Sequence, residues 1–181
     1  MVRLTEIDTI YRRLDRMAVA QARVVDRRTI PGTVTVEIDG NQWRREESGA
    51  DLGYLDLYVR NEPTGTFHDN VFVAMTRFVV DATVEVNGLF DDVFASARAL
   101  PDWMEQRADR APVSERTEGA ALQSGCYRDR DHGWLYTVTR YVAYQRGNVA
   151  YLLQMSATTA SQRSPDWAAL TRIVQSVRFD D

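Results

Sequence analysis

The sequence predicts an α+β fold in which a central antiparallel β-sheet is flanked by helices. Two long runs rich in aromatic and β-branched residues, 134–146 and 149–159, indicate paired strands. They meet at Gly147-Asn148, a pair that tolerates the positive φ of a tight hairpin turn. A Ser164-Pro165 helix start follows, and apolar residues then recur at helical spacing: Trp167, Leu170, Ile173, Val174 and Val177. We expect this helix to bury its apolar stripe on the hairpin.

Composition favours one domain and excludes several classes of function. The 181 residues are 44% hydrophobic, enough for a core, and the net charge of −4 disfavours nucleic-acid binding through bulk electrostatics. No apolar run is long enough to span a bilayer. The single Cys126 excludes an intramolecular disulfide and a Cys-rich zinc site. All 22 basic residues are arginine, so neither a P-loop lysine nor a Schiff-base lysine is present.

The N-terminal region predicts an additional helix over residues 4–25. Its apolar residues fall on alternating three- and four-residue steps: Leu4, Ile7, Tyr11, Leu14, Ala18 and Val25. Such a seam either packs on its own domain or joins two copies of the chain as a homodimer. We therefore divide the sequence into a helical extension, 1–30, packed on a single domain, 31–181.

The middle of the chain predicts the remaining strands of a sheet of about five to seven strands. Alternation of apolar and polar residues indicates strands over 33–38, 55–60 and 71–80. Asp39-Gly40 is typical of a hairpin, which would return the chain at Trp43 beside the first of these strands.

The following segment predicts one helix before the final hairpin. An amphipathic pattern indicates a helix over 89–100 that ends before Pro101. Residues 103–109 read as a further helical turn, and residues 112–128 as one or two polar strands.

Neither histidine predicts a metal or catalytic site. His68 stands beside Asp69, and His132 directly follows Asp131 and is three residues after Asp129; both histidines lie in predicted loops. A metal site would require both rings to converge with a carboxylate, whereas a loop histidine beside aspartate is more typical of a solvated turn. Cys126 has no nucleophile motif around it and is interpreted as a small core residue. We predict no catalytic residue, no metal and no cofactor.

The candidate binding surface is a set of tyrosines and arginines on the long hairpin. Four share one face of the first strand, and one lies on the return strand: Tyr136, Arg140, Tyr144, Arg146 and Tyr151. Tyrosine and arginine are the residues that most often anchor protein partners. The alternative is that the terminal helices cover this face, with the arginine heads reaching water from apolar stems.

From residue 33 onward the chain resembles the LpqN-type lipoprotein family of actinobacteria, which has the PsbP-like α/β sandwich fold. The resemblance lies in Phe67-His68-Asp69-Asn70-Val71 opening a strand, the helix closing at residues 99–103, the paired long strands, and the ending at residues 173–179. It implies an α/β/α sandwich and a non-enzymatic binding or adaptor protein, often exported and lipid-anchored. This sequence shows no signal peptide or lipobox cysteine, so we expect a cytoplasmic location.

These observations lead to one main functional hypothesis and two alternatives. The main hypothesis is a non-catalytic protein-interaction or adaptor module that binds an unidentified protein, with no nucleic-acid partner. The first alternative is a small-ligand or lipid carrier with an apolar pocket between sheet and helices. The weaker alternative is a hydrolase or metal enzyme that uses His68 or His132.

Overall fold

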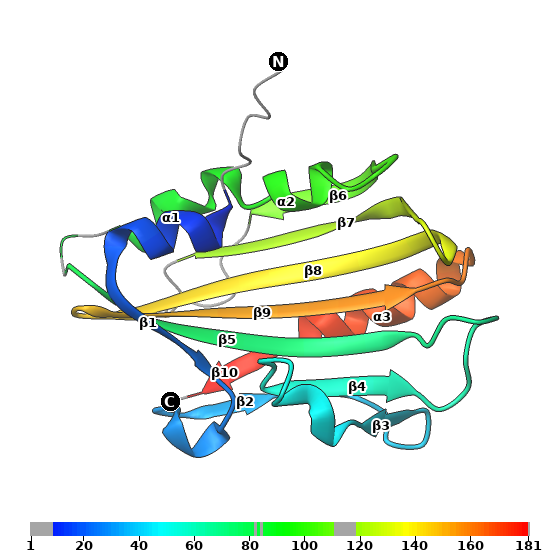
Figure 1. The fold of residues 1–181 in the computed structure, drawn as a ribbon, viewed down its shortest axis with the longest axis horizontal. Helices are drawn as coiled ribbons and strands as arrows, with labels where there is room; N and C mark the ends of the chain where they lie inside the picture. The colour runs from blue at the N-terminus through cyan, green and yellow to red at the C-terminus, as the bar shows by residue number, and fades with distance from the viewer. Residues whose placement is uncertain (1–8, 82, 84, 111–118, 181) are drawn as a thin grey trace.

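The computed structural model describes residues 9–81, 83, 85–110 and 119–180. Within these ranges eight strands form one antiparallel sheet. Seven of them follow the order β3-β4-β5-β9-β8-β7-β6, and β1 pairs with β5 along the edge that also carries β4. Figure 1 shows α3 on one side of this sheet and α1 on the other. The predicted α+β architecture with an N-terminal helix is confirmed. The sheet strands are β1 (Ala18–Val24), β3 (Trp43–Arg45), β4 (Asp56–Arg60), β5 (Asn70–Val80), β6 (Met104–Arg110), β7 (Gly119–Asp129), β8 (Gly133–Arg146) and β9 (Val149–Thr159).

The hairpin of β8 and β9 forms the centre of the sheet, as predicted. Its register runs without a shift from Tyr136 opposite Thr159 to Arg146 opposite Val149. Gly147 adopts a φ of 58°, the positive value that the tight turn requires. β7 pairs with the free edge of β8 and β5 with the free edge of β9, so every other sheet strand is added outward from this hairpin.

The face of the sheet under α3, which we call the rear face, carries the larger apolar core. α3 covers Ser164–Ser176 and has a proline in its first turn, which suits a helix start. Leu170 and Val174 are buried, and Trp167 and Ile173 are partly buried against the same core. The sheet residues beneath them alternate along their strands with those of the opposite face: Val71, Val73, Met75, Val138, Val142, Leu153, Met155 and Ala157.

The opposite face, which we call the front face, is covered over part of its area. α1 (Ile10–Met17) and the 3-10 helix η3 (Val86–Asp92) pack there, with the single turn α2 (Ala95–Arg98) beside them. Ile10 and Leu14 are 2% and 1% exposed, so the apolar side of α1 points into its own domain. They belong to one buried cluster with Phe78, Val80, Phe90, Ala121, Tyr141, Ala143, Ala150 and Leu152.

The N-terminal helix is shorter than the sequence predicts. Thr9 caps α1 by accepting a hydrogen bond from the backbone N–H of Arg12, and the helix ends at Met17. β1 then pairs antiparallel with β5. The prediction of one helix over 4–25 is therefore wrong from residue 18 onward, and its first positions lie outside the described residues. Because the edge of β5 beyond β4 offers backbone groups to pair, strand formation outweighs the helix preference of the alanines. The division of the chain at residue 30 stays a prediction.

The hairpin predicted at Asp39-Gly40 is also wrong. β2 (Thr33–Thr35) pairs with the C-terminal β10 (Arg178–Asp180) in a separate two-stranded sheet, whereas β3 pairs with β4. Asp39 instead closes a local turn, because its carbonyl accepts hydrogen bonds from the backbone N–H groups of Gln42 and Trp43. Two short 3-10 turns complete this region: η1 (Arg27–Thr29) and η2 (Glu47–Gly49).

The segment before β7 departs from the prediction as well. The single helix expected over 89–100 is divided into η3 and α2, and the helical turn expected over 103–109 is the edge strand β6. The amphipathic pattern agrees with burial at two positions, since Phe90 and Val93 are 0% and 2% exposed. Residues 104–110 form a strand because they pair with β7, and the local sequence pattern gives no information about that pairing. Part of the strand region predicted over 112–128 lies outside the described residues.

A buried carboxylate joins the N-terminal segment to the lower part of the sheet. The side chain of Asp56 on β4 is 1% exposed and forms ion pairs with Arg27 of η1 and Arg45 of β3, the latter at 2.8 Å. Arg27 also donates to the carbonyl of Val34 in β2 at 2.6 Å. The Asp56 carboxylate thus links three short segments, η1, β3 and its own strand β4.

Candidate functional site

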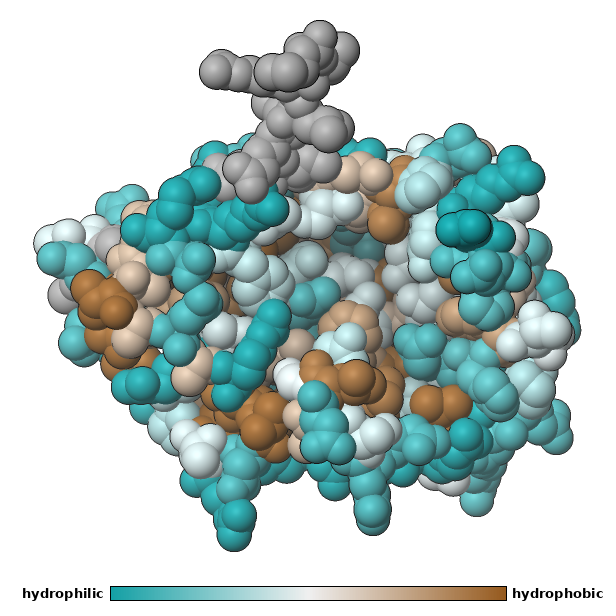
Figure 2. All heavy atoms as spheres, in the orientation of Figure 1, coloured by the Kyte–Doolittle hydropathy of each residue, from teal (hydrophilic) through white to brown (hydrophobic). Residues whose placement is uncertain are grey.

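The front face has an uncovered region that we call the open floor. It comprises the front-facing residues at the centre of β5, β9, β8 and β7, beside the area on which α1 and η3 pack; Gln154 lies at the boundary, because the Tyr11 hydroxyl of α1 donates to its Oε1 at 2.7 Å. Figure 2 shows pale side chains in the centre of this face, with teal and brown ones among them, set back from the surrounding rim. The strand registers place these residues in adjacent rows. They are Asn70, Phe72, Gln123, Thr137, Thr139, Gln154, Ser156 and Thr158.

The side chains of the open floor satisfy one another across the strands. Thr139 and Ser156 share a hydroxyl–hydroxyl hydrogen bond of 2.7 Å, and Thr137 and Thr158 share one of 3.2 Å. Ser156 is 6% exposed, so its side chain is largely buried between the strands. Cross-strand pairs of this kind fix the side-chain orientations. These hydrogen bonds hold the floor hydroxyls in fixed orientations.

The open floor contains no charged residue, although 27% of the chain is charged. A solvent-facing surface of this protein would ordinarily carry aspartate, glutamate or arginine. Depletion of charge together with aromatic side chains is the composition of the centre of a protein interface.

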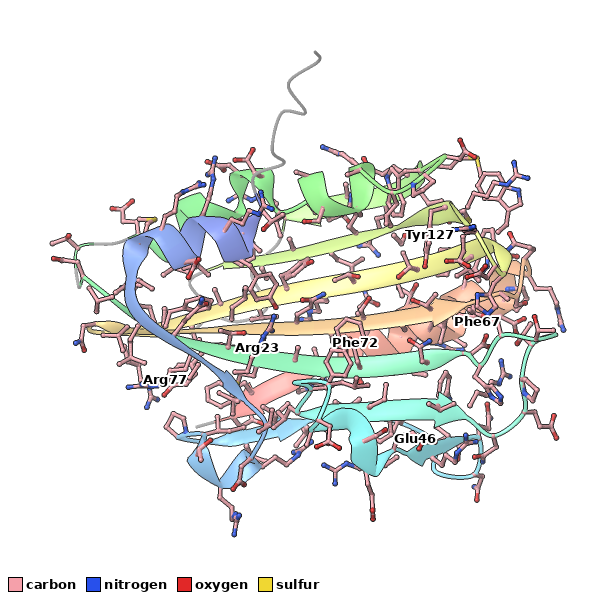
Figure 3. The ribbon with its side chains drawn as sticks, in the orientation of Figure 1. Arg23, Glu46, Phe67, Phe72, Arg77 and Tyr127 are labelled. Carbon is pink, nitrogen blue, oxygen red and sulfur yellow. The ribbon has the colours of Figure 1, made fainter. Side chains whose placement is uncertain are left out.

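Aromatic pairs border the open floor. The Tyr54 ring stacks on Phe72 with centroids 4.6 Å apart, and the Phe67 ring meets His132 edge-on at 5.1 Å. Figure 3 labels Phe67 and Tyr127 toward the same end of the sheet, with Phe72 nearer its middle. Aromatic rings combine a large apolar area with few rotatable bonds, so they are efficient contact residues.

A charged cluster stands along the β6 side of the floor. Glu105 on β6 accepts hydrogen bonds from Arg98 of α2 at 2.7 and 2.9 Å and from Gln123 of β7 at 2.8 Å. The bond from Arg98, followed by that from Gln123, lowers the pKa of Glu105 to about 2, against the opposing effect of burial. The Gln123 amide also donates to the carbonyl of Phe94 at 3.2 Å. This cluster holds β6 and α2 as a fixed wall.

A close packing contact supports the same wall. A methyl group added at Gly125 would stand 2.5 Å from the Met104 carbonyl and 2.6 Å from the Trp103 ring. Only glycine allows the Trp103 indole and the β6 backbone to approach β7 so closely.

The tyrosine and arginine set lies on the rear face, in contact with α3 and β10. Tyr136 stacks on Trp167 with centroids 4.8 Å apart, and Arg140 donates to the carbonyl of Gln175. Tyr144 meets Phe179 edge-on at 4.8 Å, and Tyr151 is 8% exposed beside the same ring. Burial raises the pKa of Tyr144 to about 12 and lowers that of Arg140. Arg146 lies at the exposed end of β8. Partner binding through this set stays a prediction, and it would require α3 or β10 to move.

The other residues weighed from the sequence occupy separate places. His68 is exposed, whereas His132 is within 3.0 Å of the Asp129 carboxylate through Nδ1. Among the described residues, no three histidine, cysteine, aspartate or glutamate side chains converge as metal ligands would. Cys126 is buried, its Sγ lies 3.8 Å from the Gln106 amide, and burial raises the pKa of its thiol. No helix in the described ranges is long and apolar enough to span a membrane.

The sequence contains a pattern that indicates the open floor, but no functional role was predicted from it. Polar residues alternate with apolar ones at the centre of both long strands, at Thr137 and Thr139 and again at Gln154 and Ser156. A central strand with a polar row on one side indicates a face that the rest of the domain does not cover. The strand predictions placed these residues together but gave them no role.

Comparison with known proteins identifies the fold. No protein-family model matches the sequence, and the curated proteins contain no sequence similar to it. Among solved structures, the chain is similar to LpqN of Mycobacterium tuberculosis, described as involved in cell envelope biogenesis. The TM-score is 0.71 over 97% of this chain and 99% of LpqN, at 12% sequence identity. The chain therefore has an LpqN-like fold, as the sequence resemblance predicted.

Proposed function

We propose that this protein is a non-catalytic protein-interaction or adaptor module and that a segment of a partner protein docks on the open floor. The observation that carries the proposal is the charge-free, aromatic-bordered floor on an otherwise charged molecule. Its hydroxyl and amide groups can bond to a partner's polar groups, and its rings supply apolar contact. We expect the partner segment to present uncharged polar and apolar side chains, because a charge placed there would meet no counter-charge on the floor.

The carrier alternative has less support from the packing. It would place a ligand between the sheet and the helices, and on the α3 side Trp167, Leu170 and Val174 already lie against the rear core. Opening that space would separate the stacked rings of Tyr136 and Trp167. LpqN is described as involved in cell envelope biogenesis, and the shared fold is compatible with an adaptor role in this chain.

The proposal is tested by site-specific photo-crosslinking in the source cells. A photoreactive residue at Thr139 lies on the floor, whereas the same residue at the exposed Thr35 of β2 provides the matched control. We expect a protein adduct at position 139 that is absent at position 35. The captured protein is then purified, and its binding is measured with Thr139→Arg and Thr35→Arg.

We expect Thr139→Arg to abolish that binding and Thr35→Arg to leave it unchanged. Equal adducts at both positions, or equal binding by both variants, would contradict docking on the open floor. A small molecule that co-purifies with the protein and is released by Thr139→Arg would instead favour a carrier.

A further inference from the structure

The outer edge of β1 is an open strand edge in the part of the chain that the structure describes. β1 pairs with β5 on one side, and no described strand pairs with its other side. Figure 1 shows β1 descending from the end of α1 to run along β5. Every residue from Val19 to Arg23 is exposed, and Val19 is 82% exposed, so solvent reaches both faces of this strand.

The hydrogen bonds of β5 show which of its backbone groups face β1. The Val80 N–H donates to the Asn148 carbonyl at 2.8 Å, on the side of β9. The Val73 carbonyl accepts from the Leu55 N–H at 2.8 Å, on the opposite side, which carries β4 and β1. Because backbone groups alternate in direction along an antiparallel strand, the odd-numbered residues of β5 face β1 and the even-numbered ones face β9.

This alternation leaves two residues of β1 with outward-directed backbone groups. The odd-numbered residues of β5 stand opposite Ala20, Ala22 and Val24, which therefore direct their N–H and carbonyl groups toward β5. Gln21 and Arg23 lie between them and direct theirs away from the sheet. A strand edge of this kind is a template on which another extended segment can pair.

β1 lacks most of the features that protect edge strands from pairing. Charged side chains, prolines and bulges are the usual protection. From Ala18 to Val24 there is no proline and Arg23 is the one charged residue, and the register shift lies at the start of the strand, which leaves Ala20–Val24 regular. The other edges of the described sheet differ, because β3 has three residues and β6 carries four charges in seven: Glu105, Arg107, Asp109 and Arg110.

The sequence of β1 is complementary to its own reverse around Gln21. When two copies are aligned antiparallel with Gln21 opposite Gln21, Ala20 of one copy faces Ala22 of the other, and Val19 faces Arg23. The outward backbone groups of Gln21 and Arg23 then meet a partner strand, and two small alanines allow the strands to approach closely. No pair of like charges is opposed, which would destabilise the pairing.

The same alignment is complementary just beyond the strand. Met17 and Val25 are 41% and 42% exposed, and each falls at the level of the other in the second copy. Arg16 of one copy likewise falls at the level of Asp26 of the other, so opposite charges are matched at both ends. Exposed apolar side chains and charges of opposite sign thus agree on one alignment and on one partner, a second copy of this chain.

We propose that two copies of this chain pair antiparallel through the outer edges of β1, with Gln21 on the two-fold axis, and so join their sheets. Pairing through one short strand forms a small interface, so the dimer is in equilibrium with the monomer. The dimer uses the strand after α1 rather than the helix, whose Ile10 and Leu14 are buried in their own domain. This inference is independent of docking on the open floor, because no floor residue takes part.

Analytical ultracentrifugation of the purified chain tests the dimer directly. We expect the dimer fraction to rise with protein concentration, and a chain that stays monomeric up to millimolar concentration would overturn the proposal. Thr139→Arg, which tests the open floor, should leave the dimer Kd unchanged, so the two proposals fail separately.

Two substitutions at Val19 test the alignment, because this side chain is opposite Arg23 of the second copy. Val19→Arg places like charges together at two symmetry-related positions, whereas Val19→Asp places opposite charges there. Both variants change the same 82% exposed side chain, so each is the folding control for the other. The dimer Kd of Val19→Arg should exceed that of Val19→Asp by about tenfold or more, and salt should reduce the difference. Equal Kd values would overturn the alignment.

Cysteine cross-linking with oxidised glutathione locates the two-fold axis. Gln21→Cys should give a disulfide-linked dimer, because the Cα atoms of a hydrogen-bonded antiparallel pair are about 5.5 Å apart. Ala22→Cys is the matched control, since its symmetry mate is displaced along the strand to about 7–8 Å, too far for a disulfide. The wild-type chain, whose Cys126 is buried, controls for the native thiol. Cross-linking of Ala22→Cys as fast as that of Gln21→Cys would overturn the proposed axis.

Discussion

The indole of Trp167 lies nearly parallel to the phenol ring of Tyr136, with centroids 4.8 Å apart and an interplanar angle of 9°. Each ring is held by a second contact, because the Trp167 Nε1–H donates to the Ser161 carbonyl at 2.7 Å and the Tyr136 hydroxyl lies 3.2 Å from that of Thr171. The pair fixes the first half of α3 against the central hairpin. It also places Tyr136 on the covered side of the sheet.

Trp167→Ala should therefore destabilise the protein by about 3 kcal/mol, the cost typical of removing a large aromatic side chain from a core. Trp134→Ala is the matched control. Because Trp134 is 39% exposed, its replacement should lower the free energy of unfolding by less than about 1 kcal/mol. Both values follow from urea unfolding curves monitored by circular dichroism. Similar losses in the two variants would mean that α3 is not held by this stack.

Gly125→Ala should destabilise the fold by about 2 kcal/mol, because the added methyl group would overlap the Trp103 ring and the Met104 carbonyl. Gly40→Ala provides the control, since nothing lies within 4 Å of the position where its methyl group would stand. The comparison requires only the unfolding midpoints of the two variants. If Gly125→Ala is as stable as Gly40→Ala, β6 and Trp103 do not pack on β7 as described.

Asp56→Asn removes a buried carboxylate and should lower the free energy of unfolding by at least about 2 kcal/mol, because Arg27 and Arg45 lose their shared partner. The half-exposed pair of Arg107 and Asp109 gives the comparison, and Asp109→Asn should cost less than about 1 kcal/mol. Asp56→Asn and Asp109→Asn differ in burial but not in chemistry. A small loss for Asp56→Asn would indicate that the N-terminal segment is held in another way.

Glu105 should contribute to the pH dependence of stability in acid. Its pKa is lowered in the folded protein to about 2 from an ordinary value of 4.5, so the folded state favours the ionised form. Its stabilising effect is therefore fully present above pH 4.5 and is lost as the pH falls toward 2. Glu105→Gln should show a shallower loss of unfolding free energy over this window than the wild type.

The carboxylates of Asp26, Asp81 and Asp129 also have lowered pKa values, but they contribute equally to the wild type and to Glu105→Gln. Glu62→Gln, at an exposed position, should show the same change of unfolding free energy with pH as the wild type. An unchanged slope in Glu105→Gln would mean that the bond from Arg98 does not persist in solution.

Elements determined by local pattern were predictable, and those determined by distant pairing were not. The turn at Gly147 and the apolar stripe of α3 depend on neighbouring residues, and both are present. By contrast, β1 becomes a strand because the edge of β5 is available, and β2 pairs with residues more than one hundred positions later in the sequence. The alternation in β9 placed Gln154 and Ser156 on one face, but only the packing of α1 and α3 decides which face remains open.

The pairing of β2 with β10 has a consequence for the order of folding. Arg178–Asp180 supplies the only strand partner that Thr33–Thr35 has in the described structure, and Phe179 contacts Tyr144 from the same strand. During synthesis, the region around residue 33 must therefore wait for residues 178–180 to emerge from the ribosome. A chain that stalls before residue 178 would expose Val34, which is otherwise 2% exposed.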